Sequence, residues 1–504
     1  MVAGLYALFF LAKVDGRLDG DDHFTLWLSS ALQQGDRLYV DVFDPGVPLQ
    51  VALSYLGVLA TGSRTLGEIL LALSLRIAGL VGVFLLIRRL TGNPIAAVFT
   101  TIPVALWFLS MQIYGAEKVA IYPWAVLVAW RYVDSGRSPL ALAAVIVVAG
   151  LLRHDHGVYV GATVVAAIAM RPRPWPTLAS TAFATLILLS PWVVLVSVRE
   201  GLFSYIEGRV AFSFVLGLGE PRSFSFTLPW ISARNAAQWL WYLAALSTAG
   251  GLAVALRRRQ PHAIVLGVAS AVVCAGLMRK AGQSGETASL WVPLLAWLFT
   301  QAPTFARATV GAVVAVSLAA LVMLTETMER LPRLALEGGG LRARAESAWR
   351  FHSSRTPLEQ YAPSDVRDER LVIRYVSQCL APGDRIWETS NWFPLSFYAG
   401  RRPVWHPYWD VEFLSDEVAQ RRALSWLEGQ QVPVIVVRYH DDPFDAFHAH
   451  ALVRNYVKDH YDEITSPRFA EFSAIYRIRL LVDRSRPPVG RFEPLDLPCF
   501  TAPS

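Results

Sequence analysis

The sequence predicts a polytopic α-helical membrane protein with a C-terminal soluble α/β domain, and three observations support this fold class. Charged residues make up 17% of the 504 residues, against about 25% in a typical soluble protein, and the mean hydropathy is +0.38. Up to about residue 327, apolar runs follow one another at lengths of roughly 15–22 residues, which suit a hydrocarbon core about 30 Å thick. After Glu329 charged residues return to soluble density. This pattern excludes a soluble enzyme, a disordered chain and a disulfide scaffold.

We expect about eleven transmembrane helices. They fall at residues 1–12, 72–90, 94–113, 117–133, 138–153, 157–170, 177–198, 236–256, 262–280, 287–300 and 308–327. The first run is too short to cross a bilayer, and it has neither the cationic start nor the cleavage site of a signal peptide. We therefore expect the first helix to begin upstream of Met1, or the bilayer to thin there.

Arginines lie in alternate connections between these spans. They are Arg88, Arg89, Arg131, Arg137, Arg171, Arg173, Arg257, Arg258, Arg259 and Arg307. The positive-inside rule makes these connections cytoplasmic, which delivers the C-terminal domain to the extracytoplasmic side of the cytoplasmic (inner) membrane. The net charge of +6 therefore reflects topology, and we expect no nucleic-acid partner.

Acidic residues are distributed even more unevenly than arginines. Those expected on the outer side are Asp15, Asp19, Asp21, Asp22, Asp36, Asp41, Asp44, Glu68, Glu117, Asp155, Glu200, Glu207, Glu220 and Glu286, whereas Asp134 is the single acid in the inner connections. Acids contribute little to topology. Chemistry at the outer face is one cause of such an asymmetry.

We divide the chain into a membrane domain at 1–328, with a first outer loop at 13–71, a linker at 329–365 and an α/β domain at 366–504. Within the last part, periodicity predicts helices at 371–380 and 453–461, and strands at 385–389, 432–438 and 474–481. Cys274 lies in an apolar run and is expected to be a core residue. Cys379 and Cys499 could pair if this domain is exported.

The first outer loop carries Asp21 and Asp22 immediately before an apolar pattern at 24–32 that predicts an amphipathic helix. Carboxylates at this position are favoured by the helix dipole, so capping explains them, as does simple solvation of an outer loop. A carboxylate at the bilayer surface is also what is needed to take a proton from an acceptor hydroxyl.

The loop resembles the first outer loop of GT-C glycosyltransferases, closest in pattern to the protein O-mannosyltransferases and the lipid A aminoarabinose transferases. The resemblance rests on Asp21-Asp22, Gly35-Asp36, Leu38-Tyr39-Val40-Asp41 and Pro45-Gly46-x-Pro48-Leu49, with Arg88-Arg89-Leu90, Glu117 and the exported C-terminal domain beyond the loop. It covers the whole chain through short motifs. It implies that Asp21 is the general base and that Asp22, where a glutamate is usual, is the reserve.

Two further outer turns carry ionisable residues. In the turn at 114–118, Lys118 would hold a lipid-linked phosphate and Glu117 would assist, although Lys118 could equally extend to the membrane surface. At 153–157, Arg153-His154-Asp155-His156-Gly157 interrupts an apolar region. The guanidinium of Arg153 suits phosphate oxygens, whereas His154, Asp155 and His156 could ligate a metal or form an ordinary loop-capping turn.

These residues together predict transfer of a sugar from a polyprenyl phosphate donor to a hydroxyl of a lipid, glycan or protein acceptor. Asp21 or Asp22 would act as base, Lys118 and Arg153 would bind the donor phosphate, and the supporting residues would be His23, Asp41, Glu117, His154 and Asp155. We expect inversion and no required cofactor, although a divalent cation is possible. The alternatives are a polytopic transporter or flippase and a non-catalytic scaffold of similar fold.

Overall fold

The computed structural model describes residues 2–14, 18, 24–42, 44, 46–62, 65–111, 113, 116–206, 236–278, 284–301, 314, 340–354, 369–389, 392, 394–404, 417–447 and 450–501. The chain forms two compact units. The first contains Met1–Asp15, Pro45–Gln50 and Ile69–Ala348, and the second contains Gly16–Asp44, Val51–Glu68 and Trp349–Ser504. The predicted span at 308–327 lies outside the described residues, apart from Val314.

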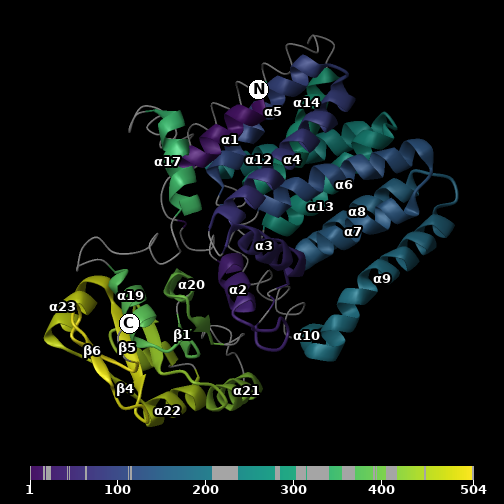
Figure 1. The fold of residues 1–504 in the computed structure, drawn as a ribbon. Coiled ribbons are helices and arrows are strands. Elements are labelled where there is room, and N and C mark those ends of the chain that lie inside the picture. The colour runs from purple at the N-terminus through teal and green to yellow at the C-terminus, as the bar shows by residue number, and fades with distance from the viewer. Residues whose placement is uncertain are drawn as a thin grey trace. The chain divides into compact units, whose positions relative to one another are not determined.

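The first unit is a helical bundle (Figure 1). Its described helices are α1 (Val2–Lys13), α4 (Leu66–Thr91), α5 (Pro94–Ser110), α6 (Ala116–Ser135), α7 (Pro139–Leu152), α8 (His154–Ala169), α9 (Pro174–Arg199), α10 (Leu202–Tyr205), α12 (Ala236–Arg257), α13 (Pro261–Met278) and α14 (Ser284–Thr300). Each predicted span from 1–12 to 287–300 therefore falls on one helix. Among the described residues, Leu66–Thr91, Pro174–Arg199 and Trp239–Arg257 are long and apolar enough to cross a membrane, and the other apolar helices are shorter.

Small residues let these helices approach closely. A Cβ atom added to Gly79 of α4 would lie 2.7 Å from the carbonyl oxygen of Val119 in α6, and one added to Gly82 would lie 2.7 Å from Pro123. The start of α6 therefore packs against the α4 backbone itself, which leaves little freedom in where the first turn of α6 can lie.

One end of the bundle gathers the connections that carry arginine. Asp134 at the end of α6 pairs with Arg89 of α4 and accepts a hydrogen bond from His262 Nε2 of α13 at 2.7 Å. The guanidinium of Arg171 lies over Gly136, close enough that a Cβ there would clash. The ends of α4 and α6, the start of α13 and the α8–α9 connection thus lie together, as the alternation of basic loops predicts.

The second unit contains helices from the first outer loop. Helix α2 (Phe24–Gln33) matches the predicted amphipathic helix, whereas α3 (Pro48–Thr61) was not predicted. The first residues of α4, up to Glu68, belong to this unit and cross α3 at two glycines: a Cβ on Gly67 would lie 2.4 Å from backbone atoms of Gly57. The segment 329–365, expected as a linker, contains helix α17 (Leu341–Ser354).

The C-terminal part of this unit contains a five-stranded sheet in the order β2-β1-β3-β5-β4. The strands are β1 (Arg385–Glu388), β2 (Arg402–Pro403), β3 (Val434–Arg438), β4 (Tyr461–Glu463) and β5 (Ile478–Asp483). Strands β2, β1 and β3 are parallel, and β5 is antiparallel to β3 and β4. A separate hairpin consists of β6 (Gly490–Phe492) and β7 (Leu497–Cys499). The predicted strand at 474–481 is wrong in its first residues, because helix α23 (Pro467–Tyr476) continues to Tyr476.

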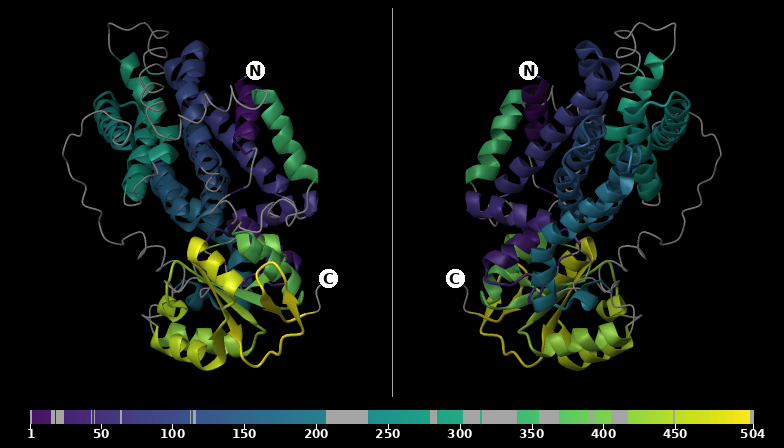
Figure 2. Two further views of the ribbon diagram at one scale, coloured as in Figure 1. Left: turned by 90° about the vertical axis from the view of Figure 1, so that its left-hand side faces the viewer. Right: turned by 90° about the vertical axis from the view of Figure 1, so that its right-hand side faces the viewer.

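Helices cover both faces of this sheet, which is why β3 is buried on both sides (Figure 2). Ile435 and Val437, which alternate onto one face, pack with Val453 and Val457 of α22 (Ala451–His460). Helix α19 (Leu371–Cys379) lies on the other side of the strands, next to the short helix α20 (Pro394–Ala399). Helix α21 (Glu417–Glu428) packs beside α22.

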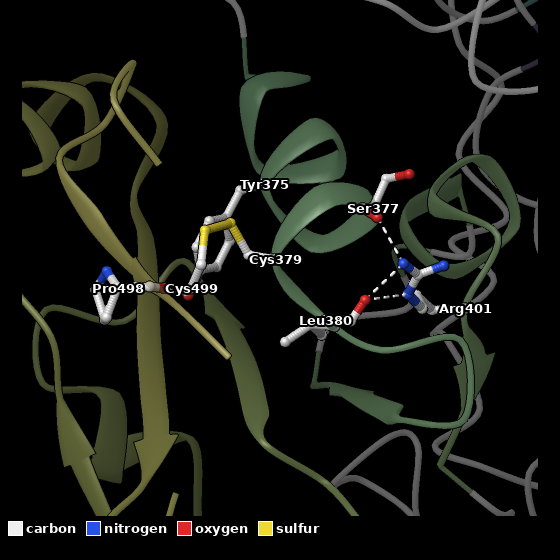
Figure 3. Close-up of a disulfide and its surroundings, with 7 residues drawn as sticks. All are labelled: Tyr375, Ser377, Cys379, Leu380, Arg401, Pro498 and Cys499. Atoms are coloured by element: carbon white, nitrogen blue, oxygen red, sulfur yellow. Dashed lines mark hydrogen bonds between the residues drawn. A yellow bond between two sulfur atoms is a disulfide. The ribbon is translucent and has the colours of Figure 1, made fainter. Parts of the chain in front are cut away.

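A disulfide joins Cys379, at the end of α19, to Cys499 of β7 (Figure 3). Both cysteines are fully buried. Tyr375 Oη donates a hydrogen bond to the Pro498 carbonyl at 2.9 Å, and Arg401 binds the last carbonyls of α19, including that of Leu380 at 2.6 Å. The terminal hairpin is therefore fastened to α19, and the pairing that export would allow is present in the structure.

Candidate functional site

The turn between α7 and α8 is built around Arg153. This residue has an extended backbone (φ −168°, ψ 134°) that ends α7, and its amide donates to the Ala149 carbonyl at 2.9 Å. The two helices then pack tightly as a hairpin, since a Cβ on Gly157 would lie 2.8 Å from Gly150. The polar interruption predicted at 153–157 is thus a sharp reversal between two apolar helices, with its side chains collected at one end of the bundle.

Arg153 is held by a neighbour in its own turn. Its Nε lies 2.9 Å from Asp155 Oδ1, and both side chains are mostly buried. Asp155 also lies in the first turn of α8, where the helix dipole favours a carboxylate. His156 is fully buried, and its ring centroid lies 5.2 Å from that of Tyr122 in α6. Asp155 therefore orients the guanidinium, and His156 packs the turn against α6.

The side chain of His154 contacts α9 and α10. Its Nδ1 lies 2.9 Å from the Gly150 carbonyl and its Nε2 lies 2.5 Å from the Tyr205 hydroxyl. Since a carbonyl only accepts, a neutral imidazole donates from Nδ1 and accepts from Tyr205 at Nε2. The Trp192 ring lies 5.5 Å from the His154 ring. Sequence reasoning missed both aromatic partners, which are residues of ordinary apolar or loop segments.

Part of the first outer loop also reaches this turn. The His154 amide donates to the Gly46 carbonyl at 3.3 Å. Gly46 has a φ of +92°, and a Cβ added to it would lie 3.1 Å from His154 Cδ2. The conformation and the close approach both require glycine here. Gly46 of the Pro45-Gly46-x-Pro48 motif therefore packs on the turn that carries Arg153.

Lys118 lies at the same end of the bundle. It is in the first turn of α6 and is 2% exposed. Tyr122, which contacts His156, follows one turn later on the same face of α6. Lys118 lies one turn before Tyr122 in α6, and Arg153 lies three residues before His156. Both cations therefore lie on the N-terminal side of the contact between the Tyr122 and His156 rings. Glu117 precedes Lys118 in α6, and its side chain is outside the described part of the structure.

Two further basic residues, which sequence reasoning did not select, bind backbone carbonyls at the end of α5, shortly before α6 begins. Arg76 of α4 is fully buried and donates to the carbonyls of Phe108 and Met111. Lys13 Nζ donates to the same Met111 carbonyl at 2.6 Å. The carboxyl end of a helix attracts positive charge. An arginine in the middle of an apolar run was the signal that could have revealed Arg76.

Asp41, predicted as a supporting residue, lies in the second unit and binds within its own turn. Its carboxylate accepts from the Arg37 amide at 2.9 Å and from Arg37 Nε at 2.8 Å. Partial burial opposes ionisation of Asp41, but the hydrogen bonds from Arg37 and the charges of Arg37 and Arg385 outweigh it and lower its pKa. The geometry gives Asp41 a role in shaping the loop.

Asp21, Asp22 and His23 lie outside the described residues. Within the described part of the chain, no three His, Cys, Asp or Glu side chains converge in a group that could hold a metal ion. His154 and His156, the metal ligands considered from the sequence, contact Tyr205 and Tyr122 respectively.

Fold and site together define a class of protein. It has a bundle of apolar helices with a charged turn at one end, and the same chain contains a mixed parallel and antiparallel sheet covered by helices. The structure is similar to the crystal structure of ArnT from Cupriavidus metallidurans in the apo state, with a TM-score of 0.52 and 14% sequence identity over 95% of this chain and 96% of that chain. No protein-family model and no curated protein matched the sequence. The likeness to ArnT extends over nearly the whole chain and shows a shared fold.

Proposed function

We propose that the chain is a membrane glycosyltransferase of the GT-C type that transfers a sugar from a polyprenyl phosphate donor to an acceptor hydroxyl. In this proposal the reaction takes place at the extracytoplasmic face of the inner membrane, where an odd number of spans from a cytoplasmic N-terminus would also put the C-terminal domain. The observation that supports this most directly is the grouping of Lys118 and the Arg153 turn at one end of a bundle with the fold of ArnT, a GT-C lipid A aminoarabinose transferase. The basic connections at the other end of the bundle suit the cytoplasmic side.

In this proposal Lys118 and Arg153 bind the donor phosphate. Cleavage of the bond between the anomeric carbon and the phosphate oxygen leaves a polyprenyl phosphate with an additional negative charge. Positively charged side chains that donate hydrogen bonds, fixed in a water-poor site, stabilise such negative charge strongly. Because the phosphate is a good leaving group, the step needs no general acid.

The acceptor supplies the nucleophile. Asp21 removes the proton of the acceptor hydroxyl while its oxygen attacks the anomeric carbon opposite the phosphate, so the configuration inverts. The proton goes to the Asp21 carboxylate, a new glycosidic bond forms, and polyprenyl phosphate leaves. Asp22 is the reserve base, and His23 and Glu117 assist the acceptor or the donor. No step requires a metal ion.

Replacement of Asp21 tests the base. Purified protein in lipid nanodiscs is supplied with polyprenyl phosphates carrying radiolabelled hexose or aminopentose, and membrane extract serves as acceptor. We expect Asp21→Asn to lower transfer by at least about a hundredfold, in the range of general base catalysis. Asp19→Asn, a neighbouring acid in the same loop, is the control and keeps its activity. Near-full transfer by Asp21→Asn would eliminate Asp21 as the base.

Binding of the donor's lipid phosphate is tested separately from sugar transfer. Added polyprenyl phosphate should raise the melting temperature of the wild-type protein, because a ligand that binds the folded state stabilises it. Arg153→Ala and Lys118→Met should reduce this shift, whereas Arg484→Gln, which replaces an exposed arginine in the turn after β5, should retain it. An unchanged shift in both site variants would contradict the phosphate role.

A further inference from the structure

A buried ion cluster joins the first outer loop to the sheet. The Asp36 carboxylate accepts hydrogen bonds from Arg385 Nη1 at 3.0 Å and Nη2 at 2.6 Å, and from Arg402 Nη1 at 3.2 Å. The Asp36 side chain is 1% exposed, and Arg385 is almost as buried. Asp36 and Arg385 are 349 positions apart in the sequence, yet both belong to the second unit. We call Asp36, Arg385 and Arg402 the Asp36 clamp.

The two arginines are themselves fixed by the sheet. Arg385 begins β1 and Arg402 begins β2, and the two residues are register partners in this parallel pair. Arg385 Nη1 also donates to the Pro403 carbonyl at 2.8 Å, and Arg402 Nη2 donates to the Gly383 carbonyl at 3.2 Å. A bidentate arginine–carboxylate pair is directional as well as strong. The clamp therefore sets the orientation of Asp36, not only its distance from the sheet.

Asp36 in turn fixes the end of α2. Its amide donates to the Ala31 carbonyl at 3.1 Å, and Gly35, with φ of +96°, makes the turn that closes the helix. Helix α2 also contacts α20 and β2 directly. Movement of α2 away from the sheet would leave a buried charge without its partner, which is unfavourable.

The other end of α2 is tied as well. Thr25 Oγ1 donates to Glu68 Oε1 at 3.0 Å, and both side chains are buried. Helix α2 has ten residues, so its two attachments lie about 15 Å apart. Asp21 and Asp22 precede the helix directly in the sequence.

We infer that Arg385 and Arg402 of the α/β sheet are positioning residues for transfer: through Asp36 they hold α2, the helix that directly follows Asp21 and Asp22 in the sequence. The inference rests on the proposed role of Asp21 as base. It gives the α/β domain a specific task, since a base displaced by about 1 Å can cost on the order of a hundredfold in rate.

Two measurements test the structural role of the Asp36 clamp separately from the proposed glycosyltransferase function. Hydrogen–deuterium exchange of the full chain in nanodiscs reports the stability of residues 24–33, and labelled transfer gives kcat and the KM for the donor. We expect Asp36→Asn and Arg385→Gln to speed exchange of 24–33 and to lower kcat at least about tenfold, with the donor KM unchanged. Arg402→Gln, which removes the more exposed contact, should have a smaller effect. Asp462→Asn breaks an exposed Arg–Asp pair elsewhere in the domain and is the control.

Because the clamp residues act on one another, the double variant Asp36→Asn/Arg385→Gln should be no slower than either single variant. Unchanged exchange in all three clamp variants would overturn the clamp. Faster exchange with unchanged kcat would overturn the positioning role and leave the clamp a purely structural contact. A wild-type chain that transfers no sugar would overturn the proposed function and, with it, the positioning role, whereas the exchange data would still report on the clamp itself.

Discussion

At the scale of single residues, Gly46 is where the first outer loop and the Arg153 turn depend on each other. Its φ of +92° disfavours any L side chain, and its Cβ position lies against His154. Both effects act on the turn that we propose to bind the donor phosphate. A substitution here therefore differs from one at an isolated glycine of similar conformation.

We expect Gly46→Ala to lower the melting temperature and to reduce the shift induced by polyprenyl phosphate, because the added methyl must displace His154. Gly340→Ala is the matched control: Gly340 has a φ of +91° and no atom within 4 Å of its Cβ position. Backbone strain alone should act in both variants. A donor-induced shift in Gly46→Ala equal to that in Gly340→Ala would show that contact with His154 is unimportant.

Asp41 makes a pH-dependent contribution to the first outer loop. Its pKa is lowered from the ordinary value of 3.8, so the folded loop favours the ionised form. This stabilisation is fully present above about pH 4 and is lost as the pH falls through the lower pKa of the folded state. We expect exchange of residues 37–42 to accelerate below pH 4 in the wild type. In Asp41→Asn the exchange should be fast already at neutral pH, with no such acid-induced component.

At the scale of elements, the crossing of α3 and α4 depends on two glycines. A Cβ at Gly67 would lie 2.4 Å from the Gly57 backbone, which cannot move aside as a flexible side chain could. We expect Gly67→Ala to separate the helices and to lower stability by about 1–3 kcal/mol, the usual cost of overpacking. Thermal melting in nanodiscs measures this. Gly161→Ala, in a helix with open space around its Cβ position, should be neutral or stabilising; equal melting temperatures would refute the tight crossing.

Elements that depend on local signals could be predicted from the sequence. Apolar length marks the helices of the bundle, and the charged residues after Leu152 mark the break between α7 and α8. Helix α3 was missed because its 14 residues are shorter than a span and lie within a segment assigned to a loop. The strand at 474–481 was extended too far because its alternating pattern begins inside α23, whose start is capped by Ser466 and has Pro467 as its first residue.

Contacts between distant segments could not be predicted in this way. His154 was a candidate from its position, but its hydrogen bond to Tyr205 joins residues 51 positions apart. The Asp36 clamp spans 349 positions, and nothing in the local sequence of Arg385 distinguishes it from an exposed arginine. The site was therefore recognisable as a set of polar interruptions, whereas its partners required the fold.

At the scale of the whole molecule, the disulfide closes a loop between residues 120 positions apart. Loss of a native disulfide typically costs about 2–5 kcal/mol. We expect a reductant, or Cys499→Ser, to lower the melting temperature of the full chain by several degrees. Cys274→Ala should leave this sensitivity to reductant unchanged, because Cys274 is free and buried in α13. Equal melting temperatures of Cys499→Ser and the wild type under non-reducing conditions would show that the bond does not stabilise the fold.

The α7–α8 hairpin has a consequence for the lipid environment. His154 packs against Trp192, which is seven residues before the end of α9 at Arg199, so the reversal between α7 and α8 is recessed by about 10 Å relative to that end. In the function proposed above, a sugar-bearing headgroup that binds at Arg153 would enter the bundle to that depth, or the membrane would thin locally to meet it. Acyl-chain length in reconstituted vesicles should then control turnover, with short-chain phosphatidylcholine favouring it over long-chain.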